Sequence, residues 1–392
     1  MSAFAAVMTD KGTGAISTIQ LFGDSAQAIM NEVFRSVGGK PAKFQTGEIL
    51  LGVIHDGTKA IDQVTVGCEA PKSFAISCHG NPLIVEMIMQ LLQRCGAELV
   101  SAEKLLVKTL KAQKGVNAIA IEARLAQAKT KTVQGAKIIA NQVNAGLTMK
   151  ATGWVRQMNE KALEAVKTEA EEILADSVPA KLIIAGCQVA IIGPPNSGKS
   201  TLLNRLSGRQ KAIVTDIKGT TRDWVSAQCQ IPPLAVELVD TAGLDEELAA
   251  TPKRTVERAS QRRSLQVIKR AHLVLLVLDG SRPAEQLDRR LLEKIAGKKV
   301  VTVLNKCDLP CAFDTDKLPS GLANTVQISA KFGTGIEALT ETIRQVCGVA
   351  DFDLKSPVCF TSRQEKLLQR LKSAKSWPRA ASIITELLDG RV

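Results

Sequence analysis

A phosphate-binding loop between a strand and a helix restricts the fold of this chain more than any other feature. The sequence GPPNSGKS, residues 193–200, follows the apolar run CQVAIIG and opens the helical run KSTLLNRL. It fits the pattern GxxxxGK[ST], in which backbone N–H groups face nucleotide phosphates, the lysine adds positive charge and the hydroxyl binds Mg²⁺. The sequence therefore predicts a P-loop at the carboxyl end of a strand.

The surrounding sequence predicts a sheet that would hold this loop. From about residue 183 to 348, apolar runs such as HLVLLVLD and KVVTVLN alternate with helical runs such as GIEALTETIRQVCG. This alternation is typical of a mainly parallel sheet with helices on both faces. We therefore predict an inserted P-loop domain over residues 183–350 with a mainly parallel sheet.

The remaining sequence predicts two further domains, so we expect a multidomain α/β protein. Short alternating runs broken by glycine indicate an N-terminal α+β domain over residues 1–100. Residues 101–182 and 351–392 are rich in Ala, Lys, Glu and Leu with helical spacing. We interpret them as the two parts of one discontinuous helical domain.

Two loops predict which base is bound. The sequence NKCD, residues 305–308, ends the strand KVVTVLN at the edge of the sheet where ligands bind. The carboxylate of Asp308 can accept both N1–H and N2–H of guanine, which adenine cannot offer. Residues 329–331, SAK, are typical of the companion loop that lies behind the base. These motifs are characteristic of translation-factor-class GTPases and predict GTP as the nucleotide.

The predicted site combines these loops with residues that hold Mg²⁺. The predicted GTP-binding residues are Gly193, Asn196, Ser197, Gly198, Lys199, Ser200, Thr201, Asn305, Lys306, Asp308, Ser329, Ala330 and Lys331. We expect Mg²⁺ to be held by Ser200, by Thr221 of DIKGTTRD and, through water, by Asp240 at the end of LAVELVD. Gly243 of DTAG is expected to donate its N–H to the γ-phosphate.

The residue after DTAG is Leu244, where many GTPases carry the glutamine that orients the attacking water. Leucine has no polar side-chain atom, so three interpretations remain: hydrolysis is lost, a partner supplies it, or another residue does the work. Asn196 is one candidate, because its side-chain oxygen can hold a monovalent cation where an arginine finger acts elsewhere. The alternative is that Asn196 only forms a turn.

Composition indicates the environment and the class of partner. The net charge of +12 lies mainly in residues 101–181 and 355–391, and it favours either contact with RNA phosphates or solvated helix faces. The nine cysteines form no CxxC pair, which indicates reduced, mostly buried thiols. We see no secretory pattern at the N-terminus and no apolar run long enough for a membrane span. We expect a cytoplasmic protein without membrane contact.

Several stretches together resemble the tRNA modification GTPase family, called TrmE or MnmE. In the G domain they are PPNSGKSTLLN, AIVTDIKGTTRDW, DTAGL and NKCD. The N-terminal stretches TDKGTGAISTIQLFG, IDQVTV, EAPKSF and CHGN follow in the family's order. A two-part helical domain around an inserted G domain is also the family's architecture.

The resemblance implies a homodimer through a folate-binding-like N-terminal domain and modification of the tRNA wobble uridine with a flavin-dependent partner. It also implies that K⁺ near the phosphate-loop asparagine, here Asn196, stimulates hydrolysis. A family glutamate after DTAG orients the water, and alignment back from HLVLLVLD puts Glu257 at its position. The loop before it is longer than usual, and a surface ion pair with Arg254 or Arg258 is the alternative role for Glu257. The candidate catalytic residues are thus Glu257, Asn196, Gly243 and Thr221.

The sequence also departs from the family. Gln20 replaces an arginine, and an acidic stretch is missing so that Phe74 runs directly into AISCHG; both departures count against binding of a folate one-carbon derivative. The family's terminal Cys-x-Gly-Lys, which the resemblance implies is needed to modify the wobble uridine, is replaced by LLDGRV, and Cys359 is the last cysteine. This departure counts against modification activity. The favoured prediction is a Mg²⁺-dependent, K⁺-stimulated GTPase resembling the tRNA-modifying enzymes. The alternative is a diverged GTP-controlled RNA-binding or assembly switch without modification activity.

Overall fold

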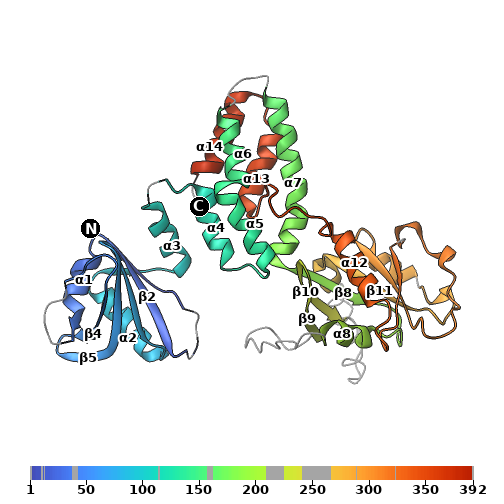
Figure 1. Ribbon diagram of the computed structural model, residues 1–392, viewed down its shortest axis with the longest axis horizontal. Helices are drawn as coiled ribbons and strands as arrows, with labels where there is room; N and C mark the ends of the chain where they lie inside the picture. The colour runs from blue at the N-terminus through green and yellow to red at the C-terminus, as the bar shows by residue number, and fades with distance from the viewer. Residues whose placement is uncertain are drawn as a thin grey trace. The chain divides into compact units, whose positions relative to one another are not determined.

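The chain forms two compact units, the first ending at Asn117 and the second running from Ala118 to Arg391 (Figure 1). The computed structural model describes residues 2–9, 12, 14–37, 43–113, 115–156, 162–208, 225–240, 266–287, 289–322 and 324–390. The first unit mixes sheet and helix, and the second joins a helical part to a P-loop sheet domain. The predicted multidomain α/β class is confirmed.

The first unit is built on a seven-stranded sheet. In spatial order its strands are β3 (Phe34–Ser36), β4 (Ile49–Asp56), β5 (Lys59–Ala70), β6 (Ser73–His79), β2 (Ile16–Gly23), β1 (Ala3–Val7) and β7 (Ala97–Leu99). Its helices are α1 (Ala26–Val33), α2 (Pro82–Arg94) and α3 (Ala102–Lys111). Neighbouring strands are antiparallel, except that β7 pairs in parallel with β1.

One face of this sheet holds the core of the first unit. Side chains alternate along each strand, so Ile19 and Leu21 of β2 and Ile76 of β6 share a face and are fully buried. Met30 of α1 and Leu92 of α2 pack in the same core. The alternation in AISTIQLFG therefore assigns Gln20 to the opposite face of β2.

Helix α3 belongs to the first unit, whereas the sequence-based boundary at residue 100 assigned it to the helical domain. The Ser101 hydroxyl caps the helix by accepting from Lys104 N at 3.3 Å, so the helix begins directly after β7. The Nζ of Lys108 lies 3.8 Å from the centroid of the Phe4 ring on β1. The local pattern predicted the helix, but these contacts decide which unit it joins.

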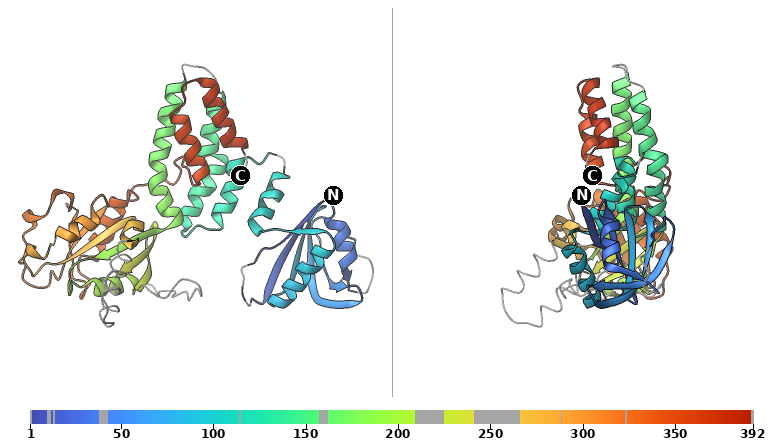
Figure 2. Two further views of the ribbon diagram at one scale, coloured as in Figure 1. Left: turned by 180° about the vertical axis from the view of Figure 1, so that it is seen from behind. Right: turned by 90° about the vertical axis from the view of Figure 1, so that its left-hand side faces the viewer.

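The helical part of the second unit comes from two segments far apart in the sequence. The segments supply α4 (Ala118–Gln127), α5 (Val133–Asn144), α6 (Gly146–Arg156) and α7 (Leu163–Ala185), and then α13 (Ser362–Lys372) and α14 (Trp377–Asp389). Helix α13 packs against α7 and α14 against α6, and both views of Figure 2 show these helices side by side. Trp154, Ile173, Leu368 and Ile384 form part of their shared core.

A buried carboxylate joins the two segments. Glu122 on α4 has only 6% of its side chain exposed. It accepts hydrogen bonds from Nε and Nη2 of Arg363, both at 2.8 Å. It also accepts from Thr361 Oγ1 at 2.8 Å and from Gln364 Nε2 at 2.7 Å. The carboxylate is therefore satisfied entirely by residues that follow the inserted domain.

The inserted domain is a six-stranded sheet. In spatial order its strands are β13 (Thr325–Gln327), β12 (Val300–Asn305), β11 (Leu273–Asp279), β8 (Cys187–Ile192), β10 (Leu234–Asp240) and β9 (Val225–Ile231). Its helices are α8 (Lys199–Ser207), η2 (Ala284–Gln286), α11 (Arg289–Ile295), η3 (Thr315–Lys317), η4 (Ser320–Leu322) and α12 (Ile336–Cys347). Only the edge strand β9 runs antiparallel to its neighbour in this sheet of described strands. The predicted mainly parallel sheet is confirmed.

Two simpler expectations can also be compared with the structure. All nine cysteines are free, and only Cys307 and Cys311 are exposed, which confirms mostly buried thiols. Within the part of the chain that the structure describes, every helix is too short or too polar to cross a membrane.

Candidate nucleotide-binding site

Residues 193–198 link β8 to α8 in a loop whose glycines are required by close contacts. A Cβ on Gly193 would lie 2.0 Å from the carbonyl oxygen of Val277. Gly198 has a φ of 94° and caps α8, and a Cβ there would lie 2.1 Å from Nδ2 of Asn305. The first backbone N–H groups of α8 therefore lie at this loop, where they favour an anion such as phosphate.

The first two residues of α8 supply a cation and a hydroxyl. Lys199 is buried, and its Nζ donates to the carbonyl oxygen of Pro194 at 2.9 Å, which holds the ammonium beside the loop. Ser200 Oγ donates to Oδ2 of Asp240 at 2.9 Å. Asp240 is the last residue of β10 and is 2% exposed. A hydroxyl and a carboxylate placed together fit the preference of Mg²⁺ for oxygen ligands.

Asn305 joins the phosphate loop to the base loop. It is the last residue of β12 and is 3% exposed. Its Nδ2 donates to the carbonyl oxygen of Ser197 at 2.8 Å, and its Oδ1 accepts from Ala330 N at 2.9 Å. One side chain therefore fixes the spacing between residues 193–198 and residues 329–331.

Lys306 is held by a carboxylate on the neighbouring strand. Its Nζ lies 2.6 Å from Oδ2 of Asp279, the last residue of β11. Burial raises the pKa of Asp279, but hydrogen bonds from Lys306 and Ser281 outweigh it and hold the pKa below its ordinary value. Asp308 is exposed two residues further along the chain, at the same edge of the sheet. The arrangement leaves the Asp308 carboxylate accessible while the Lys306 side chain is held by Asp279.

Comparison with known proteins identifies the family. Residues 3–104 match the family described as the N-terminus of the GTP-binding protein TrmE, and residues 188–306 match 50S ribosome-binding GTPases. The tRNA modification GTPase MnmE of Thermotoga maritima is 31% identical over 408 residues, which cover 95% of this chain and 88% of that protein. The chain belongs to the MnmE family. MnmE of Bacillus subtilis is 32% identical over 389 residues, covering 88% of this chain and 82% of the relative.

Membership of the MnmE family makes the chain a GTP hydrolase, as predicted. The structure brings together the phosphate loop, Asp240, residues 305–308 and residues 329–331 at the carboxyl edge of the sheet. Asn196 is exposed in the loop with a φ of 62°. The predicted Thr221, Gly243 and Glu257, together with Leu244, lie outside the described residues.

Sequence reasoning missed two residues that hold others in this MnmE-family site. Asp279 ends the run HLVLLVLD, and its place at the carboxyl edge of a predicted strand could have identified it. Arg205 on α8 donates through Nε to the carbonyl oxygen of Ala330 at 2.9 Å and through Nη2 to that of Lys331. In the sequence it is an ordinary basic residue near a helix end, so no local signal marks it.

Proposed function

We propose that this MnmE-family GTPase hydrolyses GTP to drive modification of the wobble uridine in tRNA, together with a flavin-dependent partner. The alignment with MnmE relatives over most of the chain carries the proposal. The link that Asn305 makes between the phosphate and base loops supports it, because both ends of one nucleotide would be held at a fixed spacing. The residues predicted from the sequence then bind GTP, with Lys199 on the phosphates and Asp308 on guanine.

The metal proposal rests on Ser200 and Asp240. Their contact at 2.9 Å supports a Mg²⁺ site in which Ser200 coordinates directly, Asp240 acts through water and Thr221 completes the set. A Mg²⁺ ion held there would supply positive charge that offsets the negative charge of the phosphates. Ser200 and Asp240 would hold the metal beside the N-terminus of α8.

Potassium is proposed to stimulate hydrolysis. GTP turnover is expected to be about tenfold faster in KCl than in NaCl, because a cation held by Asn196 would stabilise charge that develops between the phosphates. Asn196→Ala should remove this difference and leave GTP affinity within about twofold, since the backbone N–H groups still bind phosphate. Steady-state turnover assays in KCl and in NaCl measure the rate difference, and titration with GTP measures the affinity. Equal rates of the unmodified protein in the two salts would contradict the cation mechanism.

Glu257 is proposed to orient the attacking water in place of the missing glutamine. In the same turnover assay in KCl, Glu257→Ala should lower kcat for GTP hydrolysis about a hundredfold, because the attacking water would lose the group that positions it. Arg258→Ala serves as the matched control on the neighbouring residue. Unchanged kcat in Glu257→Ala would assign the role to another residue.

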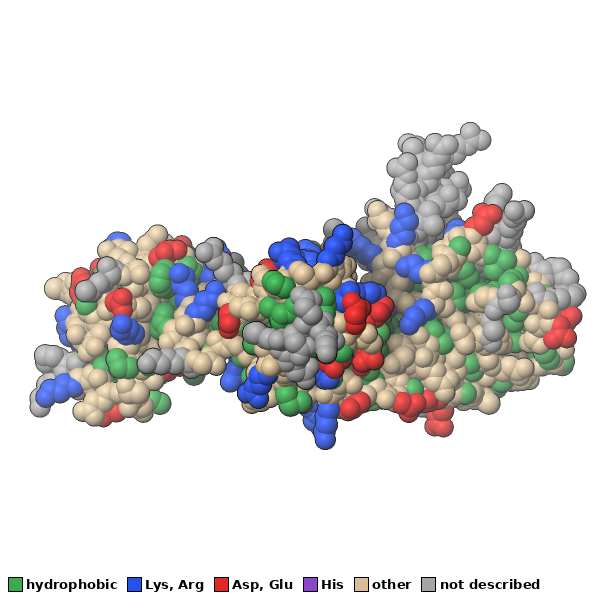
Figure 3. All heavy atoms as spheres, turned by 90° about the horizontal axis from the view of Figure 1, so that it is seen from above, with side chains coloured by type: hydrophobic (Ala, Val, Ile, Leu, Met, Phe, Trp, Pro, Cys, Tyr) green, Lys and Arg blue, Asp and Glu red, His purple; other side chains and the backbone are tan. Residues whose placement is uncertain are grey.

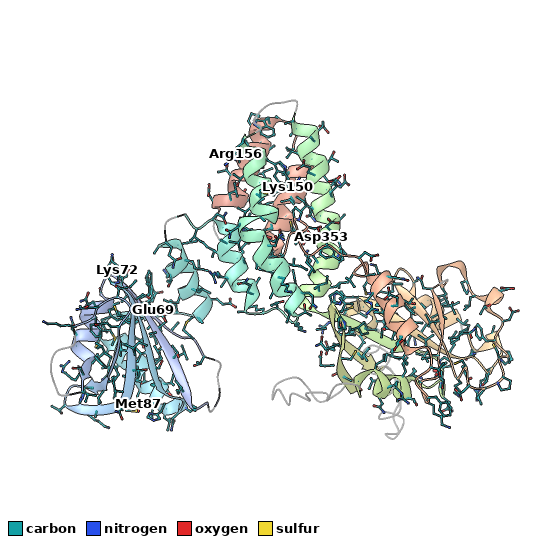
Figure 4. All side chains as sticks on the ribbon, viewed as in Figure 1. Glu69, Lys72, Met87, Lys150, Arg156 and Asp353 are labelled. Atoms are coloured by element: carbon teal, nitrogen blue, oxygen red, sulfur yellow. The ribbon has the colours of Figure 1, made fainter. Side chains whose placement is uncertain are left out.

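The helical part supplies basic side chains suited to RNA. Arg156 is the last residue of α6 and is exposed. Lys375, just before α14, and Arg379, in the first turn of α14, are exposed as well. Helices α6 and α14 pack together, and Figure 4 labels Arg156 on the helical bundle. Figure 3 shows Lys and Arg side chains gathered on this part of the surface. Such a cluster would contact RNA phosphates by releasing their counterions.

The modification role predicts a change in cellular tRNA. Deleting the gene is expected to remove the 5-substituted wobble uridine from bulk tRNA, as measured by nucleoside mass spectrometry. The unmodified gene should restore it, whereas a variant with Arg156→Glu and Arg379→Glu should not, because reversed charge repels RNA phosphates. That variant should retain its GTP turnover, since neither residue lies in the nucleotide site. An unchanged nucleoside profile after deletion would contradict the modification role.

A second candidate is a GTP-controlled RNA-binding or assembly switch without modification activity. One observation favours it: Nε2 of Gln20, which replaces a family arginine, donates to Glu69 Oε2 at 2.7 Å and to Ser73 Oγ at 2.9 Å. Glu69 is labelled in Figure 4 and is exposed. A carboxylate here repels the carboxylates of a folate derivative, so we propose that folate binding is weakened. The nucleoside profile separates the two candidates.

We also propose a homodimer through the first unit, as the family resemblance implies. The exposed side chains of Ile49 and Leu51 on β4 support a contact surface there, because single strands rarely expose neighbouring large apolar residues to water. Sedimentation equilibrium should give twice the chain mass, and the chain mass alone would contradict the dimer.

A further inference from the structure

Arg205 links the helix that follows the phosphate loop to the loop that lies behind the base. Its Nε donates to Ala330 O at 2.9 Å, and its Nη2 donates to Lys331 O. We propose that Arg205 is a positioning residue for guanine recognition: it aligns residues 330–331 so that a backbone N–H group meets O6 of the base. This inference rests on the proposed guanine site and deepens it.

The two hydrogen bonds fix the direction of the peptide groups in the loop. A trans peptide is planar, and its C=O and N–H point in opposite directions. Because Arg205 draws the Ala330 carbonyl toward α8, the N–H of Lys331 points away from α8. The N–H of Ala330 is already used by Asn305 Oδ1 at 2.9 Å. Lys331 N–H is therefore the donor whose direction Arg205 sets.

The chemistry of guanine requires such a donor. If Asp308 accepts N1–H and N2–H, the adjacent O6 is an acceptor at the same edge of the base. The loop containing Lys331 lies beside the loop containing Asp308, since Cys307 N donates to Ile328 O at 3.0 Å. A donor from residues 330–331 would thus complete the recognition that Asp308 begins.

The guanidinium suits this role better than an ammonium would. Its planar fork can donate to two successive carbonyls at once, whereas a lysine ammonium is a point charge on a flexible stem. A basic residue in the last turn of α8 also interacts favourably with the helix dipole. Lysine would preserve that second role but not the fork, so Arg205→Lys separates the two.

The test measures affinities of the full-length protein for three diphosphates by titration calorimetry. They are GDP, IDP, which lacks the 2-amino group, and 2-aminopurine riboside diphosphate, which lacks O6 and the proton on N1. Arg205→Ala is expected to lower the affinity for GDP about tenfold. Its affinity for the analogue without O6 should stay within about twofold of that of the unmodified protein. The ratio of GDP to IDP should stay unchanged, because Asp308 reads the amino group. Arg205→Lys should lower the affinity for GDP about threefold. Asn204 is exposed on the same helix, and Asn204→Ala should leave the affinity for GDP unchanged.

The possible results distinguish a failure of the proposed role of Arg205 from a failure of the proposed guanine site. An equal loss for all three nucleotides, or no loss, would overturn the positioning role. A loss for GDP and IDP but not for the analogue without O6, at unchanged thermal stability, would support it, since a purely structural defect would weaken binding of all three nucleotides alike. If the unmodified protein bound GDP no better than the analogue without O6 and no better than ADP, the proposed guanine site would itself be overturned.

Discussion

Replacing Asn305 by alanine is expected to weaken GTP binding about a hundredfold. The substitution removes a 2.8 Å bond to Ser197 O and a 2.9 Å bond to Ala330 N, and both groups lie in buried surroundings. Each buried polar group left without a partner costs roughly 1–3 kcal/mol, and about 1.4 kcal/mol is a factor of ten in affinity. Titration with GTP and GDP measures the loss directly.

Two further variants make the Asn305 prediction specific. Asn305→Asp keeps the acceptor for Ala330 N but places a carboxylate against the carbonyl oxygen of Ser197, so it should also bind weakly. Asn324→Ala is the matched control, because its amide lies 3.5 Å from Val300 O, at the opposite end of β12. Affinity within about threefold of the unmodified protein in Asn305→Ala would show that the two loops keep their spacing without the link.

Replacing Glu122 by alanine is expected to destabilise the helical part by about 3–5 kcal/mol. The change leaves the Arg363 guanidinium, with only 22% of its side chain exposed, without a counter-charge. Breaking a buried ion pair from one side costs that much because the remaining charge stays desolvated. Urea unfolding in a Trp224→Phe background, followed by the fluorescence of Trp154 and Trp377 in the same core, reports on this part of the chain.

The controls for Glu122 test whether its buried contacts matter. Glu122→Gln keeps an acceptor for Thr361 and Arg363 and should lose less stability than the alanine variant. Glu172→Ala, at an exposed position of α7, should stay within about 0.5 kcal/mol of the unmodified protein. GTP affinity should be unchanged in all three, because the nucleotide site lies in the inserted domain. If Glu122→Ala lowered the free energy of unfolding by less than about 1 kcal/mol, the idea that Glu122 stabilises the contact between the two helical segments would be contradicted.

The local order of the second unit could be predicted well because its signals are short-range. The apolar runs ending at Ile192, Asp240, Asp279 and Asn305 each became a strand, and Lys199 opened the predicted helix. A loop rich in glycine at such a junction has few conformations, since Gly198 adopts a φ of 94°. The loops at residues 193–198 and 305–308 therefore lie at the strand ends where the sequence predicted them.

Contacts between distant side chains could not be predicted in this way. The sequence marked Asn305 as part of a base loop, but the structure shows that its amide reaches the phosphate loop 108 residues earlier. Arg205 and Ala330 are 125 residues apart, and Glu122 and Arg363 are 241 apart. None of these pairs has a local pattern, because each depends on how separate elements pack.

The sequence by itself determined the nucleotide loops, the strand order along the chain and the resemblance to the MnmE family, because backbone periodicity and loop conformation depend on neighbouring residues. The tertiary structure decided that α3 joins the first unit, that Glu122 closes the helical part across the inserted domain and that Arg205 holds the base loop. These outcomes required a folded core, since only packing brings side chains separated by a hundred residues or more within hydrogen-bonding distance.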